Sequence, residues 1–177
     1  MKKLIFLAAI AISFSACHSD EKGHGHHRTP AFMDSLRNDL LKTDIAFSKL
    51  SEEKGRGAAF LEYAADNATI LKTFSHPLTG RDKIKSLFDS YPDSLYSCTW
   101  VPISADVARS GEFGFTYGTY QLDIKKTGEH EAGTYCTVWH KDTTNAWKYI
   151  LDTGNEGLDP AEKEADAKID AKKVEVK

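Results

Sequence analysis

The residues with the most evident chemical potential are histidines near the start of the chain: His18, His24, His26 and His27. A neutral imidazole is a ligand for Zn, Cu or Ni, so His24, His26 and His27 could form a weak metal site. The tract offers no carboxylate at a useful spacing and has no apolar periodicity. We therefore favour a solvated tether for this stretch and assign it no metal.

The rest of the sequence lacks the residue spacings of familiar catalytic sites. We find no nucleophile next to a base, no glycine-rich phosphate loop and no closed set of metal ligands, and we expect no cofactor. His76 precedes Pro77 in a predicted loop, where a lone histidine is more often neither a ligand nor a proton carrier. The formal net charge of −3 is small and the basic residues are scattered, which argues against a nucleic-acid partner.

Three helices and one strand are predicted in the first half of the chain. Thr29 and Pro30 suit a helix start, and apolar residues then recur with helical spacing as far as Lys54. Further helices are expected over residues 58–65 and 81–91, with a strand over residues 68–74 between them. Two glycines, at positions 55 and 57, separate the first two helices.

The second half changes to runs rich in β-branched and aromatic residues, which predict strands over 95–108, 113–124, 131–140 and 147–154. Helices followed by an antiparallel meander predict an α+β fold with the helices on one face of the sheet. Cys98 and Cys136 fall on the first and third of these strands. Two strand spacings put their backbones roughly 9–10 Å apart, beyond the reach of a disulfide, so we expect two free thiols.

Both ends of the chain predict segments outside this domain. Lys2 and Lys3 precede an apolar run at residues 4–12 that is too short to span a bilayer, as in a secretory signal. Ser15, Ala16 and Cys17 resemble the lipobox of bacterial lipoproteins, although an ordinary signal peptide with a chance cysteine is the alternative.

The resulting organisation has four parts. Residues 1–16 are the expected signal peptide, and residues 17–30 are the lipidated cysteine and its tether. One domain occupies 31–157, and the charged tail at 158–177 is expected to be disordered. The lipid on Cys17 would be the protein's only membrane contact, with the outer membrane favoured and the periplasmic or surface face left open.

Five segments of the predicted domain carry a family resemblance by their order and spacing: residues 60–68 (FLEYAADNA), 80–84 (GRDKI), 114–118 (GFTYG), 135–141 (YCTVWHK) and 147–152 (WKYILD). They resemble the nuclear transport factor 2-like superfamily and, within it, the SnoaL-like proteins related to ketosteroid isomerase. The resemblance implies a cone in which three N-terminal helices pack on a strongly bent antiparallel sheet, mixed at its edge, and enclose a pocket. Members of this superfamily include enzymes and non-catalytic binders, so the fold leaves function open.

The resemblance, combined with the alternation of side chains along each strand, implies a pocket lined by Phe47, Tyr63, Lys72, Trp100, Tyr117, Tyr135, Thr137, Trp139, Ile150 and Asp152. It also implies an outer sheet face that carries Cys136, Val138, His140 and Tyr149. If the pairing register of a strand shifted by one residue, every side chain of that strand beyond the shift would point to the opposite face of the sheet. Lys72 and Asp152 could form a buried pair that orients a polar ligand or acts as an acid–base couple, although a purely structural ion pair or a solvated Lys72 is the favoured alternative.

The resemblance also allows a test of isomerase chemistry. The base, tyrosine and acid positions of the family's isomerases fall at Lys72, Phe47 and Tyr135. Phe47 has no hydrogen to donate, and Lys72 replaces a carboxylate, so steroid isomerisation is not expected.

Three functions remain open. The favoured one is non-catalytic binding of an unidentified small molecule. The second is SnoaL-like acid–base chemistry of the isomerase, dehydratase or hydrolase type on a small carbonyl or ring compound, with Asp152, Tyr135 and Lys72 as the catalytic candidates. The third is protein interaction through a homodimer that uses the outer sheet face.

Overall fold

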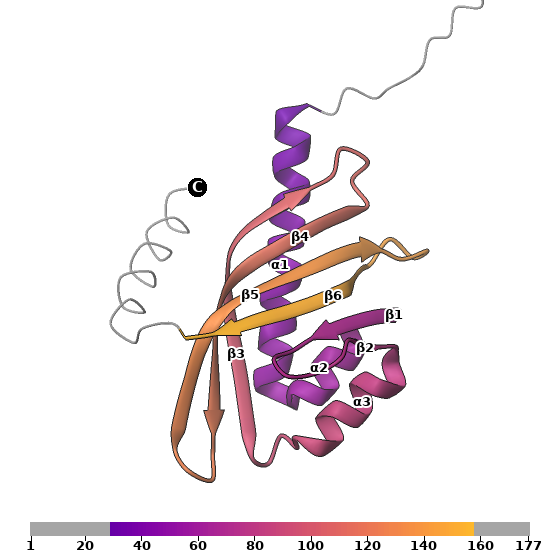
Figure 1. The fold of residues 1–177 in the computed structure, drawn as a ribbon. Coiled ribbons are helices and arrows are strands. Elements are labelled where there is room, and N and C mark those ends of the chain that lie inside the picture. The colour runs from indigo at the N-terminus through magenta and orange to yellow at the C-terminus, as the bar shows by residue number, and fades with distance from the viewer. Residues whose placement is uncertain (1–28, 158–177) are drawn as a thin grey trace, which may run out of the picture.

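A long helix lying across a strongly bent, six-stranded sheet forms the body of the protein (Figure 1). This computed structural model describes residues 29–157, and no helix within that range is long and apolar enough to cross a membrane. Several predicted features lie outside the described residues: the signal peptide at 1–16, Cys17, the histidines His18, His24, His26 and His27, and the tail at 158–177.

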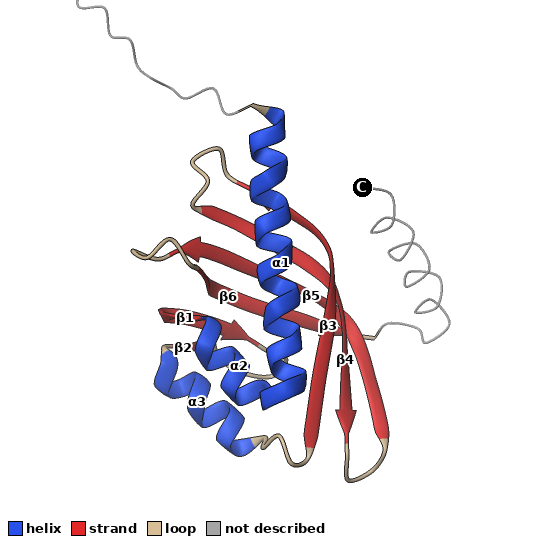
Figure 2. Ribbon diagram, turned by 180° about the vertical axis from the view of Figure 1, so that it is seen from behind, coloured by secondary structure: helices blue, strands red, loops and turns tan. Residues whose placement is uncertain are grey.

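Three helices occupy one face of the sheet (Figure 2): α1 (Pro30–Lys54), α2 (Arg56–Tyr63) and α3 (Arg81–Ser90). Gly55 separates α1 from α2 with a backbone φ of 91°, which a glycine adopts without a side-chain clash. The chain therefore turns sharply there, and α2 begins directly after α1.

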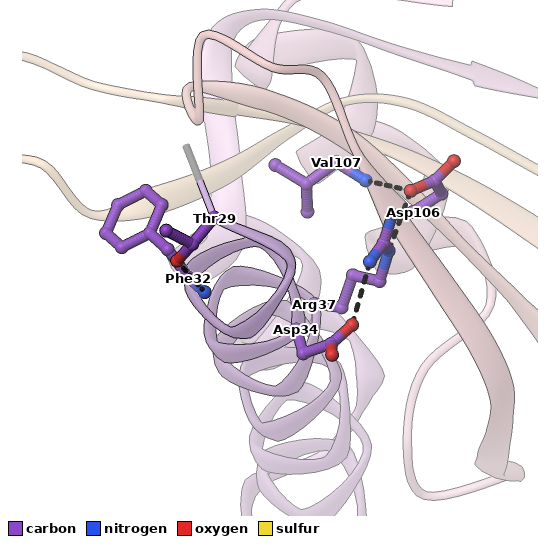
Figure 3. Close-up of polar contacts among 6 residues, drawn as sticks. All are labelled: Thr29, Phe32, Asp34, Arg37, Asp106 and Val107. Atoms are coloured by element: carbon purple, nitrogen blue, oxygen red, sulfur yellow. Dashed lines mark hydrogen bonds and ion pairs between the residues drawn. The ribbon is translucent and has the colours of Figure 1, made fainter. Parts of the chain in front are cut away.

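The first turns of α1 are fixed by a hydrogen bond at the helix cap and by side-chain contacts of Arg37 (Figure 3). The Thr29 hydroxyl accepts a hydrogen bond from the Phe32 backbone N–H at 3.3 Å, which satisfies one otherwise free donor of the first turn. Arg37 donates to Asp34 on the same helix and to Asp106 on the sheet, both at 2.9 Å. These contacts dock the first turns of α1 onto the end of a long strand.

The strands are β1 (Ala64–Leu71), β2 (Leu78–Thr79), β3 (Tyr96–Val107), β4 (Phe113–Ile124), β5 (Glu129–Lys141) and β6 (Trp147–Glu156). Their order in the sheet is β2-β1-β6-β5-β4-β3. β1 runs parallel to β6, and the other neighbours are antiparallel. This mixed edge and the helices on one face agree with the predicted α+β fold.

The boundary between the second helix and the strand that follows it differs most clearly from the sequence-based prediction, which placed that strand over residues 68–74 rather than Ala64–Leu71. Alanines favour helix, and the second helix was expected to run to residue 65, but it ends at Tyr63 and β1 begins at Ala64. Ala64 is extended, with φ −69° and ψ 134°, and is paired with Tyr149 of β6. Pairing with a strand distant in sequence therefore outweighs a weak local preference.

The core is largely aromatic and centres on Phe47 of α1, which is 1% exposed. Its ring centroid lies 4.5 to 5.9 Å from those of five other rings: Phe60, Tyr63, Trp100, Trp139 and Tyr149. Offset and edge-to-face ring contacts of this kind add stabilisation to that of the buried area.

A buried polar stripe on α1 contacts the edge strand β3. Ser48 Oγ accepts from the backbone N–H of Trp100, and Ser51 Oγ donates to the carbonyl of Cys98, both at 2.8 Å. An edge strand has backbone groups without a strand partner, and these two serines satisfy two of them. Cys98 and Cys136 are both free thiols, as predicted.

Candidate functional site

A cavity of about 650 Å³ lies between the inner face of the sheet and the helices α2 and α3. Residues of α2, α3, β1 with the loop that follows it, and β3 to β6 contribute to its lining. Four of the predicted pocket residues line it: Lys72, Trp100, Tyr135 and Asp152. The volume is in the range that accommodates a small organic molecule.

One wall of the cavity is a continuous row of four aromatic rings. Neighbouring centroids lie 4.8 Å apart for Phe88 and Phe60, 5.9 Å for Phe60 and Trp100, and 6.4 Å for Trp100 and Tyr135. All four residues line the cavity. Such a wall provides flat apolar surface against which a ring or an alkyl chain can pack.

Asp152 of β6 supplies the carboxyl group of the cavity. The hydroxyl of Thr137, its cross-strand partner on β5, donates to Asp152 Oδ2 at 2.7 Å. Burial raises the pKa of Asp152 from 3.8 to about 7, and the nearby charge of Asp44 acts in the same direction. Within residues 29–157 this carboxyl has no other hydrogen bond and no ion pair.

A second carboxyl, Asp44 of α1, lies behind the aromatic wall and has no exposed surface. It accepts hydrogen bonds from Trp100 Nε1 at 2.8 Å and from the Tyr135 hydroxyl at 2.7 Å. The Thr116 hydroxyl also contributes a bond, and its oxygen accepts from Trp139 Nε1 at 2.9 Å. Burial raises the pKa of Asp44 above its ordinary value.

Asp44 was not predicted as a site residue. One signal was present: the acid stands four residues after Leu40 and three before Phe47, on the stripe that faces the sheet. An acidic residue in such a stripe requires buried partners, and both of the partners that line the cavity, Trp100 and Tyr135, had been predicted as pocket residues.

Charged residues at the cavity contact neighbouring aromatic residues through the backbone or the side chain. Arg56 donates from Nη2 to the Tyr91 carbonyl at 2.9 Å, and the Lys72 ammonium lies 4.6 Å from the centre of the Tyr91 ring. Glu131 accepts from the Tyr120 hydroxyl at 2.7 Å. The hypothesis of a buried pair between Lys72 and Asp152 is wrong, because Lys72 is exposed and makes no ion pair with that carboxyl.

Tyr117 was predicted to face the pocket, and this is wrong. It is 45% exposed, and its ring stacks on Phe115 at 6.5 Å on the opposite face of β4. The buried residues of that strand are Gly114, Thr116 and Gly118, so the alternation places Tyr117 outward.

The expected positions of Ile150 and Tyr149 are also corrected. Trp139 pairs with Tyr149 and Val138 pairs with Leu151, which leaves Ile150 as an extra residue in β6. This β-bulge reverses the alternation, so both Tyr149 and Asp152 face inward. Tyr149 is fully buried against Phe47 rather than on the outer face, and Ile150 does not line the cavity.

The other predicted pocket residues, Phe47, Tyr63, Thr137 and Trp139, do not line the cavity either. They lie in the packed interior beside it, where Thr137 and Trp139 are 1% and 0% exposed. Rings on a concave sheet face can fill the space themselves, and here they fill the part covered by α1. Within the described residues, no group of three or more metal-ligating side chains is present.

Comparisons with known proteins support the fold. No family model and no curated protein matches the sequence. Among solved structures, a ketosteroid isomerase-like protein from Erwinia carotovora is similar at a TM-score of 0.57 and 12% identity, over 68% of this chain and 96% of that one. A nuclear transport factor 2-like protein with a cystatin-like fold from Novosphingobium aromaticivorans matches at 0.57 and 11%, over 79% and 97%.

A nuclear transport factor 2-like protein of unknown function from Pseudomonas putida matches at a TM-score of 0.58 and 6% identity, over 72% of this chain and 90% of that one. At such identities the similarity establishes the fold and not the activity. The chain therefore has the nuclear transport factor 2-like, cystatin-like fold, and its sheet is open rather than closed into a barrel.

Proposed function

We propose that this protein binds a small, partly aromatic or apolar molecule in the cavity between the sheet and helices α2 and α3. The observation that supports this most directly is the row of four rings beside a carboxyl that has a single hydrogen-bond donor. The lining combines flat apolar surface with a few polar groups, the composition typical of a site for a small molecule.

Native mass spectrometry of the full chain, purified in detergent from the cells that make it, tests this proposal. The expected result is one small molecule retained per chain. Repeating the purification in a second detergent distinguishes a cellular ligand from bound detergent, because only the mass of a detergent adduct changes.

Two matched variants connect any retained mass to the cavity. Leu122→Trp places a large ring in the cavity, and Gln121→Trp places the same ring on the exposed face at the next position of β4. We expect the first substitution to remove the retained molecule and the second to leave it bound. Retention by both variants would place the ligand elsewhere and overturn the proposal.

A second candidate function, acid–base catalysis, is supported by the pKa of Asp152, which burial raises to about 7. A group that titrates near neutral pH exchanges a proton easily in both directions, as a general acid or base requires. Tyr135 faces the same cavity, whereas exposed Lys72 is poorly placed to act as the electrophile. Turnover of a retained ligand by the native chain but not by folded Asp152→Asn would support catalysis.

We further propose that the domain is anchored in the cell envelope, in the outer membrane, through a lipid on Cys17. The support is the short apolar run followed by Ser15, Ala16 and Cys17. Mass spectrometry of the purified chain would then give a mature protein that begins at residue 17 and carries acyl chains. An unmodified Cys17 overturns this part.

The homodimer remains a separate proposal, supported by exposed apolar side chains on the outer sheet face. Val101, Phe113, Phe115 and Tyr117 are 39 to 55% exposed there. Exposed apolar groups concentrated on one face are typical of an interaction surface. Sedimentation at micromolar concentration measures the mass directly, and a monomer contradicts this proposal.

A further inference from the structure

The formal charges of the residues that line the cavity do not sum to zero. Arg56 and Lys72 contribute two positive charges, and Glu131 and Glu156 contribute two negative ones. Asp152 is the remaining charged residue of the lining. The ionised lining therefore has a formal excess of one negative charge.

Within residues 29–157 Asp152 forms no ion pair with a cation, although Arg56 and Arg81 act on two of the acidic groups around it, Cys98 and Tyr149. Its single hydrogen-bond partner is the neutral Thr137 hydroxyl, and the titratable groups whose pKa responds to its charge are acidic: Cys98, Tyr135, Cys136 and Tyr149. Asp44 acts on it as a second carboxyl. An uncompensated charge in such surroundings is costly, and a bound cation would remove that cost.

The aromatic wall also favours a positive charge. Trp100 and Tyr135 line the cavity and donate their polar hydrogens to Asp44, which does not line it. Donation to a carboxyl polarises each ring, which makes its π-face more negative. A cation over such a face is attracted by the ring quadrupole.

We propose that the occupant of the cavity is a small organic cation, an amine that is protonated at neutral pH and carries an apolar or aromatic body. This inference rests on the proposed binding function and narrows it to one ligand class. The ammonium group binds the free oxygen of Asp152 beside the faces of Trp100 and Tyr135, and the body packs along Phe60 and Phe88. A neutral ligand leaves Asp152 uncompensated, and an anion is repelled by both carboxyls.

A charge series of three probes of nearly equal shape tests the inference on the full chain. Phenethylamine is the cation, 2-phenylethanol the neutral analogue and phenylacetate the anion, each titrated calorimetrically at about pH 8, where Asp152 is mostly ionised. We expect the amine to bind at least about tenfold more tightly than the alcohol, and the anion more weakly than both.

The variant Asp152→Asn removes the charge and keeps an oxygen to accept from Thr137. It should reduce the preference for the amine to less than about threefold and leave the affinity for the alcohol nearly unchanged. Asp89→Asn on α3, which removes an exposed carboxylate paired with Lys85, is the control and should retain the full preference.

The outcomes separate the inference from the function on which it rests. If the alcohol or the anion binds as tightly as the amine, the cation inference is overturned and the binding function stands. If none of the three probes binds while the native chain retains a cellular molecule without a basic nitrogen, the inference is again overturned. The series on the native chain decides the charge preference by itself, even if Asp152→Asn does not fold.

Discussion

Asp44 of α1 and Asp152 of β6 are interior carboxyls on opposite sides of the same aromatic wall. They differ in their hydrogen bonding. Asp44 accepts from Trp100, Tyr135 and Thr116, and it has no exposed surface. Among the described residues Asp152 accepts from Thr137 alone, and it lines the cavity. Burial raises the pKa of both groups.

The difference separates a structural acid from one available to a ligand. Asp44 connects α1 to three strands, and each of its partners would lose a hydrogen bond without it. Asp152 retains unused acceptor capacity in a space that a ligand can enter. A buried group with satisfied bonds contributes to the specificity of folding, whereas one with unused capacity marks a candidate site.

The largest expected effect is the loss of the structural acid. Asp44→Ala leaves the donors of Trp100, Tyr135 and Thr116 without a partner and opens a void beneath α1. We expect the free energy of unfolding to fall by about 3–5 kcal/mol, measured by urea denaturation.

Asp39→Ala is the matched control for this substitution. Asp39 lies on the same helix and also accepts from an indole, Trp147 Nε1, at 3.0 Å, but it is half-exposed. Its removal should cost about 1 kcal/mol or less, because water replaces the lost acceptor. If both variants lost the same free energy of unfolding, the claim that Asp44 is a structural acid with buried, irreplaceable partners would be contradicted.

The second effect is a pH dependence that belongs to Asp152. Its pKa in the folded state is about 7 against an ordinary 3.8, so the folded protein holds this proton more tightly than the unfolded chain. The free energy of unfolding therefore falls as the pH rises from about 4 to 7, and it stays lower above that range. We expect Asp152→Asn to remove about 2–3 kcal/mol of this fall, since cavity water screens part of the full effect.

Denaturation curves of the native chain and of Asp152→Asn at several pH values measure the difference between them. Titrations of exposed groups are common to both proteins and cancel in that difference. A constant difference between about pH 4 and 8 would mean that the carboxyl is solvated and titrates normally.

A smaller effect is expected from the one donor to Asp152. Thr137→Val keeps the shape of the buried side chain and removes its hydroxyl, at a cost of about 1 kcal/mol. The hydrogen bond of Thr137 lowers the pKa of Asp152, so its loss should move that pKa further upward. Carboxyl titration by NMR follows this shift, and an unchanged midpoint would exclude the hydrogen bond.

The smallest effect is expected outside the interior. Tyr117→Ser on the outer sheet face should change the free energy of unfolding of the monomer by less than about 0.5 kcal/mol, because Tyr117 has only a stacked contact with Phe115 there. Thermal unfolding at low protein concentration measures it. A loss comparable to that of Thr137→Val would show that this face is covered in solution.

Much of the fold was predictable from local patterns. Thr29 and Pro30 marked the start of α1, the glycines near residue 55 marked its end, and runs rich in β-branched and aromatic residues located the four long strands. These signals are local because caps, turns and strand alternation depend on neighbouring residues. The free thiols of Cys98 and Cys136 followed from strand order alone.

The candidate site was less predictable because two of its determinants are not local. The bulge at Ile150 depends on how β5 and β6 pair, and it reversed the expected directions of Tyr149 and Ile150. Asp44 reads in sequence as an ordinary polar residue of a helix. Its donors come from strands β3, β4 and β5, more than 50 residues away along the chain.

The sequence by itself therefore determined the order and the class of the elements, since these follow from caps, periodicity and turn residues along the chain. Only the tertiary structure decided which part of the inner sheet face is packed and which part is open. α1 presents Phe47 to the first part, and the rings there fill the space. Beside α2 and α3 the inner sheet face is not filled by side chains, and Asp152 lies at the cavity there. The extra residue in β6 turns Tyr149 of the same strand into the packed part.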